Sequence, residues 1–238
     1  MIELRPFDRL GGANHGWLDT KFHFSFADYF EQTRLHWGAL RVWNDDHIAP
    51  QSGFPPHPHK DMEIITYVRK GAITHTDSMG NEGRTEAGDV QVMSAGTGIR
   101  HSEYNREDED TEIFQIWIIP SERGGEPTWG AKAFPKDDRA GQFVTLASGN
   151  VPTGSNDNEA PLPIRTDAKV LGATIKAGES VTYDVASLRR HLYLVPATGK
   201  VAVNGVEAKQ RDGVAITQAE EITITALEDS EVVLVDAA

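Results

Sequence analysis

Two short segments of the chain carry histidine and carboxylate side chains at a spacing that suits metal coordination. His57 and His59 stand two residues apart, and so do His101 and Glu103. Residues i and i+2 of an extended strand point to the same face, so each segment can present two ligands side by side. Three neutral imidazoles and one carboxylate suit Fe(II), Mn(II), Co(II), Ni(II), Cu(II) or Zn(II), whereas Ca(II) and Mg(II) prefer oxygen ligands. We therefore predict that these four residues hold one divalent transition metal.

The other histidines divide the chain into two unequal halves. Eight of the nine lie at or before His101, and the ninth, His191, has no histidine near it in sequence. We expect His75 to lie at the surface or behind the ligands. Four more are expected to be core or loop residues: His15, His23, His36 and His47. The second half of the chain is therefore predicted to lack a matching metal site.

Composition narrows the classes of function. The chain has no cysteine, which excludes disulfides, thiolate metal ligands and cysteine nucleophiles. Its 238 residues carry 23 Lys and Arg against 36 Asp and Glu, and the formal charge of −13 disfavours nucleic acid and anionic membranes as partners. No window approaches the ~20 apolar residues of a membrane helix, and the start MIELRPFDRL lacks a secretory pattern. We expect a cytoplasmic protein with no nucleic-acid or membrane partner.

The elements that must position the ligands have the pattern of β-strands. Short alternating apolar runs such as EIITYV (63–68), IFQIWII (113–119) and EITITAL (221–227) are separated by turn residues. We expect a hairpin between residues 72–75 and the strand after Gly88, and Asn204-Gly205 is typical of a two-residue hairpin turn. A short helix is expected at most in residues 28–40.

An internal repeat indicates how these strands are grouped. The strand, turn and returning strand that follow Gly71 are echoed after Gly199, which favours two related antiparallel β-barrels, or jelly rolls, in tandem. Polar stretches at 120–138 and 148–163 are predicted to be loops. We predict an N-terminal metal-binding domain over residues 1–132 and a C-terminal domain without a metal over residues 133–238.

Several longer motifs in the first half resemble those of a known family. They are NHGWLD (14–19), FSFA (24–27), LRV (40–42) with NDD (44–46), HPHKDME (57–63), DSMGN (77–81) and MSAGTGIRHSEYN (93–105). Together they resemble the pirin family of the cupin superfamily, in particular its bacterial members known as quercetin 2,3-dioxygenases. The resemblance implies a bicupin fold, with one metal in the first barrel and none in the second.

The resemblance also assigns residues. The ligands of the family fall on His57, His59, His101 and Glu103, while cupins outside the pirin family take their glutamate from the first motif, where Glu63 stands. Following the pirin pattern, we take Glu103 as the ligand and Glu63 as a pocket residue or a residue behind the ligands. Strand parity alone does not decide between the two glutamates.

The function implied by the resemblance is cleavage of a flavonol such as quercetin by O2 to a depside and carbon monoxide. Fe(II) is the first choice of metal, and Glu103 is the candidate base for the flavonol 3-hydroxyl. A different class is a metal-bound regulatory or redox-sensing module that binds a protein partner and has only incidental dioxygenase activity. A third class is a sugar or small-acid cupin, which the pirin-like motifs disfavour.

Overall fold

The computed structural model describes residues 1–151 and 160–238, and within them the chain is built from strands with three short 3-10 helices and no α-helix. Part of the predicted 148–163 loop lies outside the described residues. The first half contributes a seven-stranded and a four-stranded sheet, which we call the first large and first small sheets. The second half contributes the second large and second small sheets, of seven and four strands, except that residues 2–5 supply one edge strand of the second large sheet.

The order of strands across each sheet defines the architecture of the two halves. The first large sheet contains β12 (Thr128–Lys132), β9 (Val90–Ser94), β6 (Glu63–Lys70), β11 (Thr111–Ile118), β4 (Leu40–Ile48), β3 (Leu18–Phe22) and β2 (Gly11–Asn14). The first small sheet contains β5 (Ser52–His59), β10 (Ile99–Asn105), β7 (Ala72–Asp77) and β8 (Glu82–Glu86). The second large sheet contains β1 (Ile2–Arg5), β20 (Gly213–Thr217), β17 (His191–Thr198), β22 (Ser230–Ala237), β15 (Ala168–Ile175), β13 (Val144–Ser148) and β14 (Leu162–Pro163). The second small sheet contains β16 (Ser180–Asp184), β21 (Glu221–Ala226), β18 (Lys200–Val203) and β19 (Val206–Lys209). The 3-10 helices are η1 (Phe7–Arg9), η2 (Gln32–Arg34) and η3 (Lys136–Arg139).

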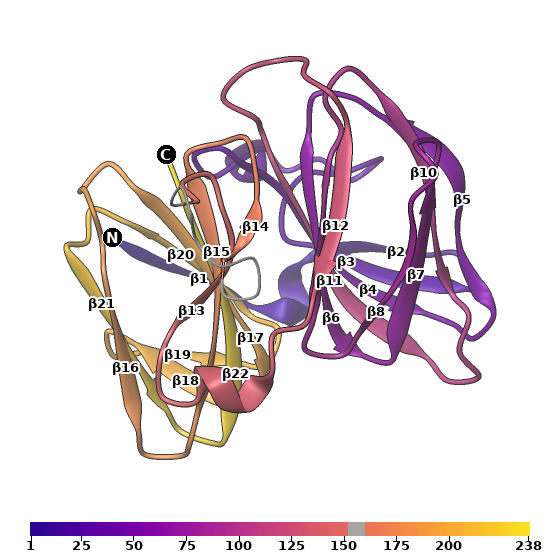
Figure 1. The fold of residues 1–238 in the computed structure, drawn as a ribbon. Helices are drawn as coiled ribbons and strands as arrows, with labels where there is room; N and C mark the ends of the chain where they lie inside the picture. Colours follow the sequence, from indigo (N-terminus) through magenta and orange to yellow (C-terminus); the bar gives the residue numbers. More distant parts are fainter. Residues whose placement is uncertain (152–159) are drawn as a thin grey trace.

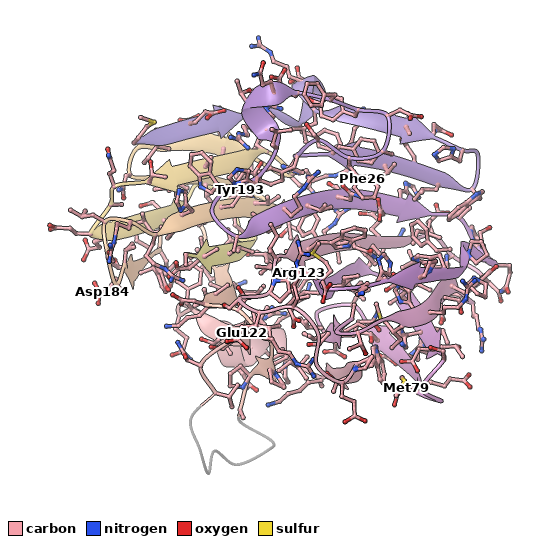
Figure 2. All side chains as sticks on the ribbon, turned by 90° about the horizontal axis from the view of Figure 1, so that it is seen from above. Phe26, Met79, Glu122, Arg123, Asp184 and Tyr193 are labelled. Atoms are coloured by element: carbon pink, nitrogen blue, oxygen red, sulfur yellow. The ribbon has the colours of Figure 1, made fainter. Side chains whose placement is uncertain are left out.

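The four sheets form four layers, with the two large sheets back to back at the centre (Figure 1). A buried cluster that includes Trp43, Phe114 and Tyr193 fills the space between the large sheets and joins the two halves. Figure 2 views the same layers from above, with Tyr193 labelled where the strands of the two halves meet. Burying this much aromatic and aliphatic surface is the main force that holds the halves together.

Both halves repeat one strand order. In the first half the order β9-β6-β11-β4-β3 faces β5-β10-β7-β8, and in the second half β20-β17-β22-β15-β13 faces β16-β21-β18-β19. The predicted pair of related antiparallel halves is therefore confirmed. The Asn204-Gly205 hairpin is confirmed as well, since it joins β18 to β19 with φ of 44° and 85° at the two turn residues.

The two ends of the chain cross between the halves. Strand β1 pairs with β20 and forms one edge of the second large sheet. Its position there corresponds to that of β12, which pairs with β9 at one edge of the first large sheet. At the other end the Ala39 amide donates to the carbonyl oxygen of Ala238. The chain passes from the first to the second large sheet between Lys132 and Val144, close to the predicted boundary at 132/133, which itself stays a prediction.

Two local predictions need correction. The hairpin that leaves Ala72 returns through β8, and the strand after Gly88, β9, belongs to the opposite sheet. Residues 120–138 are not all loop, because β12 adds an edge strand there. The short helix expected within residues 28–40 is the three-residue 3-10 helix η2, none of whose residues is buried. Within the described residues no helix is long and apolar enough to cross a membrane.

Candidate metal centre

Three of the four predicted ligands converge between the first small sheet and the first large sheet. His57 and His59 come from β5, and His101 comes from β10, where it is the register partner of His57. The ligand nitrogens of all three lie within 4.8 Å of one another. The Nε2 atoms of His57 and His101 are 3.1 Å apart. The i, i+2 spacing therefore presents imidazoles as predicted.

The Nδ1 contacts of His57 and His101 leave the Nε2 atoms of these two rings facing each other at 3.1 Å. Nδ1 of His57 lies 2.8 Å from the carbonyl oxygen of Pro55 and donates to it. Nδ1 of His101 lies 3.4 Å from Nδ1 of His75, whose own Nε2 donates to Asp77 Oδ2 over 2.8 Å. An imidazole that donates through Nδ1 carries its lone pair on Nε2, which is the tautomer that binds a metal. Nε2 of His59 is buried and has no hydrogen-bond partner in the described part of the chain.

Electrostatics keep two of these rings, His59 and His101, neutral. Burial, and then the neighbouring imidazoles, lower the pKa of His59 to about 4. Burial is also the largest cause that lowers the pKa of His101 to about 4, against the attraction of Glu103. Both rings are therefore neutral at pH 7, and neutral imidazole is the form that coordinates metal ions.

The Glu103 carboxylate lies close to the His101 ring and is held by three hydrogen bonds. Its Oε1 accepts hydrogen bonds from Gln91 Nε2 (2.7 Å) and Thr66 Oγ1 (3.1 Å), and its Oε2 accepts one from Gln115 Nε2 (2.8 Å). Burial acts to raise the pKa of Glu103, but His101 and Gln115 outweigh it and hold that pKa below its usual value. A carboxylate offers about four lone-pair sites, so three donors leave one site unused.

The structure places Glu103 in a second group of potential ligands with His101 and His75. His101 is common to this group and to the group of three histidines. His75 is fully buried and stacks on Trp129 with ring centroids 4.8 Å apart, so it lies behind the ligands and not at the surface. The assignment of His57, His59, His101 and Glu103 as the ligand set stays a prediction.

Glu63 lies away from this centre, which corrects its placement as a pocket residue or a residue behind the ligands. Its carboxylate accepts hydrogen bonds from Ser94 Oγ (2.6 Å) and the Arg165 amide (3.1 Å), on the face of the first large sheet that meets the second half. Strand parity with His59 does not hold because the chain turns at Asp61, where φ is 49°, and enters a different sheet.

A cavity of about 850 Å³ opens beside the three histidines. His57 and His59 form part of its wall, and aromatic rings form much of the rest, among them Trp17, Phe54 and Trp117. The Trp117 ring meets the His59 ring edge to face at 4.9 Å. Ligand cavities of this size with apolar walls and a few polar groups are typical of small-molecule sites. A cavity of about 740 Å³ around Arg123 and Arg165 lies apart from the histidines.

The donors that hold Glu103 were not predicted from the sequence. Gln91, Thr66 and Gln115 are register partners across β9, β6 and β11, so they form one polar row on the inner face of the first large sheet. Apolar residues such as Ile64 and Val68 flank this row. Each polar residue takes the place of an apolar one in an alternating strand, and that interruption was the signal available in the sequence.

The same positions of the second half carry aliphatic side chains. The strands of the two halves can be matched by their order and register, starting from Gly71 in the first half and Gly199 in the second. In this match Leu194 stands where the first half has Thr66, Val214 where it has Gln91, and Leu234 where it has Gln115. The same match sets Ile224 in place of Glu103 and Val203 in place of His75. These five residues pack together in the apolar core of the second half.

The order of strands and the histidine centre between the first two sheets define a bicupin. Residues 4–118 match the pirin family model, and residues 153–237 match the model described as the quercetinase C-terminal cupin domain. The chain is 66% identical to a pirin-like protein of Caulobacter vibrioides over 100% of both chains. It is 42% identical to the quercetin 2,3-dioxygenase of Escherichia coli K12, over 99% of this chain and 98% of that one.

A solved structure agrees with these matches. The bacterial pirin YhhW of Escherichia coli in complex with nickel(II) superposes with a TM-score of 0.90 at 40% identity, covering 100% of this chain and 99% of that chain. The chain belongs to the pirin family.

Proposed function

We propose that this chain is a metal-dependent dioxygenase that cleaves a quercetin-like flavonol with O2 to a depside and carbon monoxide. The observation that carries the proposal is the cluster of three imidazoles whose ligand nitrogens converge beside an aromatic cavity, with His57 and His59 in the cavity wall. Relatives named quercetin 2,3-dioxygenase support the choice of reaction. One flavonol and one O2 are consumed, and both atoms of O2 end in the depside as the ring carbon leaves in carbon monoxide.

The residues present fit a metal. Two Nε2 lone pairs 3.1 Å apart, on His57 and His101, repel one another unless a cation or proton lies between them. Nε2 of His59 is buried without a partner, which is costly in the absence of a bound group. We propose His57, His59, His101 and Glu103 as the ligands. Fe(II) is our first choice among the ions this donor set accepts, and nickel(II) is bound by the bacterial relative.

A divalent cation supplies one effect, since it lowers the pKa of a hydroxyl group that binds to it. The remaining work belongs to the chain. Trp117, Phe54 and Trp17 offer flat apolar surfaces on which the rings of a flavonol can stack while water is excluded. Three hydrogen bonds leave Glu103 with one unused lone-pair site. Glu103 accepts the proton of the flavonol 3-hydroxyl at this site, which requires that the cation does not occupy the site at that moment.

The test is metal analysis combined with turnover of quercetin. Purified protein is loaded in turn with Fe, Mn, Co, Ni and Cu, and the quercetin absorbance and carbon monoxide are followed in air. We expect decay with at least one ion, and loss of both metal and decay in His57→Ala and His101→Ala. His47→Ala is the matched control, because this histidine is partly exposed beside Asp110 and lies outside the centre.

Two outcomes would contradict parts of the proposal. Metal that binds with no quercetin decay for any ion would overturn the dioxygenase and favour the regulatory, protein-binding class. Metal retained in full by both alanine variants would overturn the ligand assignment.

A further inference from the structure

The cavity contains a second polar cluster that the reaction above does not use. Asn44 and Asp46 are two residues apart on β4, so their side chains point to the same face, and both line the cavity. Thr20 on β3 is the register partner of Asp46 and donates its hydroxyl to Asp46 Oδ1. All three residues are buried, with exposed fractions of 6% for Asn44, 3% for Asp46 and 3% for Thr20.

This cluster has hydrogen-bond acceptors left over. The side-chain oxygen of Asn44 is buried and has no partner in the described part of the chain. Asp46 accepts the Thr20 hydroxyl at Oδ1, and its Oδ2 has no hydrogen bond within residues 1–151 and 160–238. Buried acceptors of this kind nearly always find a donor, from the protein, from water or from a ligand. Within the described residues the cluster therefore holds two side-chain acceptor oxygens without a donor, on two residues that line the cavity.

The fold itself does not require these polar residues. The register that relates the two halves matches Asn44 to Leu171 and Asp46 to Ala173 on β15. Both of these residues belong to the apolar core of the second half. A polar pair that costs stability and is dispensable to the fold indicates a ligand at this wall.

We propose that Asn44 and Asp46 form a subsite that accepts hydrogen bonds from hydroxyl groups on a ring of the ligand remote from the histidine centre, and that this subsite selects polyhydroxylated phenolic ligands. The inference rests on the proposed function and names the substrate feature that the site recognises. The aromatic walls bind any flat ring, whereas two unpaired acceptors discriminate between rings with and without hydroxyl donors.

The protonation of Asp46 agrees with this role. Burial raises the pKa of Asp46 to about 7, against the hydrogen bond from Thr20, and the nearby charges of Asp45 and Glu103 raise it further. At neutral pH the Asp46 carboxyl group is therefore present in protonated and ionised forms. Each form retains acceptor capacity for a hydrogen bond from a ligand hydroxyl group.

The experiment measures binding separately from turnover. Quenching of tryptophan fluorescence is titrated without O2, because Trp17 and Trp117 line the cavity. The two probes are quercetin and 3-hydroxyflavone, which keeps the 3-hydroxyl group and lacks the other four. We expect wild-type protein to bind quercetin about tenfold more tightly, since a site built to accept hydroxyl groups rejects the analogue without them.

Two variants introduce the residues that the second half carries at the same positions. Asn44→Leu and Asp46→Ala are each expected to reduce the preference for quercetin to about threefold or less and to leave 3-hydroxyflavone binding within about twofold of wild type. Asp46→Asn keeps the side-chain shape and an acceptor oxygen, and it is expected to give an intermediate preference even if Asp46→Ala fails to fold. His47→Ala, the neighbour on β4 beside Asp110, is the matched control.

The outcomes separate this inference from the proposed function. Equal loss of both probes, or an unchanged preference in the variants, would overturn the subsite even if quercetin is cleaved. A wild-type preference that both variants abolish, together with no quercetin decay for any metal, would support the subsite and overturn the dioxygenase.

Discussion

The ion pair between the halves gives a prediction whose size can be worked out from the structure. Asp45 of the first half is fully buried and is bound by two arginines. Arg211 of the second half donates to it through Nε (2.6 Å to Oδ2) and Nη2 (3.0 Å to Oδ1), and Arg69 donates through Nη2 at 2.5 Å. The Arg211 guanidinium also lies 4.0 Å above the ring of Phe7.

Replacing Arg211 by Met keeps the apolar stem of the side chain and removes both hydrogen bonds. Each charge-assisted bond is worth about 1.5–3 kcal/mol, and the contact with Phe7 about 0.5–1 kcal/mol. Two considerations lower the sum: the Arg211 side chain is 28% exposed, and Asp45 keeps its bond to Arg69. We therefore expect Arg211→Met to reduce the free energy of unfolding by about 2–4 kcal/mol.

The assay is urea unfolding followed by two probes. All five tryptophans lie at or before Trp129, so fluorescence reports on the first half, and far-UV circular dichroism reports on both halves. The matched control is Arg106→Met, which breaks the exposed 3.3 Å pair with Glu82 and should cost less than about 1 kcal/mol. If Arg211→Met shifts the midpoint no further than Arg106→Met does, the ion pair does not hold the halves together.

Three further outcomes are expected. Gln115→Leu removes one of the donors that orient the buried Glu103 carboxylate, and we expect the metal Kd, measured by chelator competition, to rise about 10–100-fold; an unchanged Kd would contradict this. Gly83→Ala places a methyl group against the Trp129 ring and should lower the free energy of unfolding by about 1–3 kcal/mol in urea, whereas Gly130→Ala, with its nearest neighbour at 3.6 Å, should change it little; equal effects would refute the packing argument. The pKa of Asp46 is raised to about 7 in the folded protein, so the folded state binds more protons than the unfolded state between about pH 4 and pH 7, and this group lowers stability as pH rises through that range. Asp46→Asn should therefore gain stability relative to wild type from pH 4.5 to 7.5 in metal-free protein, and a constant difference across that range would contradict the assignment.

The sequence was sufficient where the structure depends on local periodicity. The i, i+2 rule applies within β5, so it placed His57 and His59 on one face, and the Asn204-Gly205 turn was identified because its two residues accept positive φ. The same rule failed for Glu63, because parity is lost when a chain turns and joins another sheet.

The sequence did not predict which strands far apart along the chain pair with each other. Nothing in the residues of β1 indicates that its partner is β20, at the far end of the chain. The donors of Glu103 were within reach, since Gln91 and Gln115 interrupt apolar runs at inward positions. Their convergence on one carboxylate nevertheless depends on β9, β6 and β11 lying side by side, which single strands do not specify.

The crossing of the chain ends governs how the protein can fold as it is synthesised. Strand β1 is synthesised about 200 residues before its partner residues 213–217, so β1 must wait unpaired while the first half forms. Ala238 then joins the first half, because its carbonyl oxygen accepts a hydrogen bond from the Ala39 amide. A chain that stops before β20 is complete keeps β1 as an unpaired strand, and such strands promote aggregation. Synthesis must therefore pass β20 before this risk of aggregation is removed from the nascent protein.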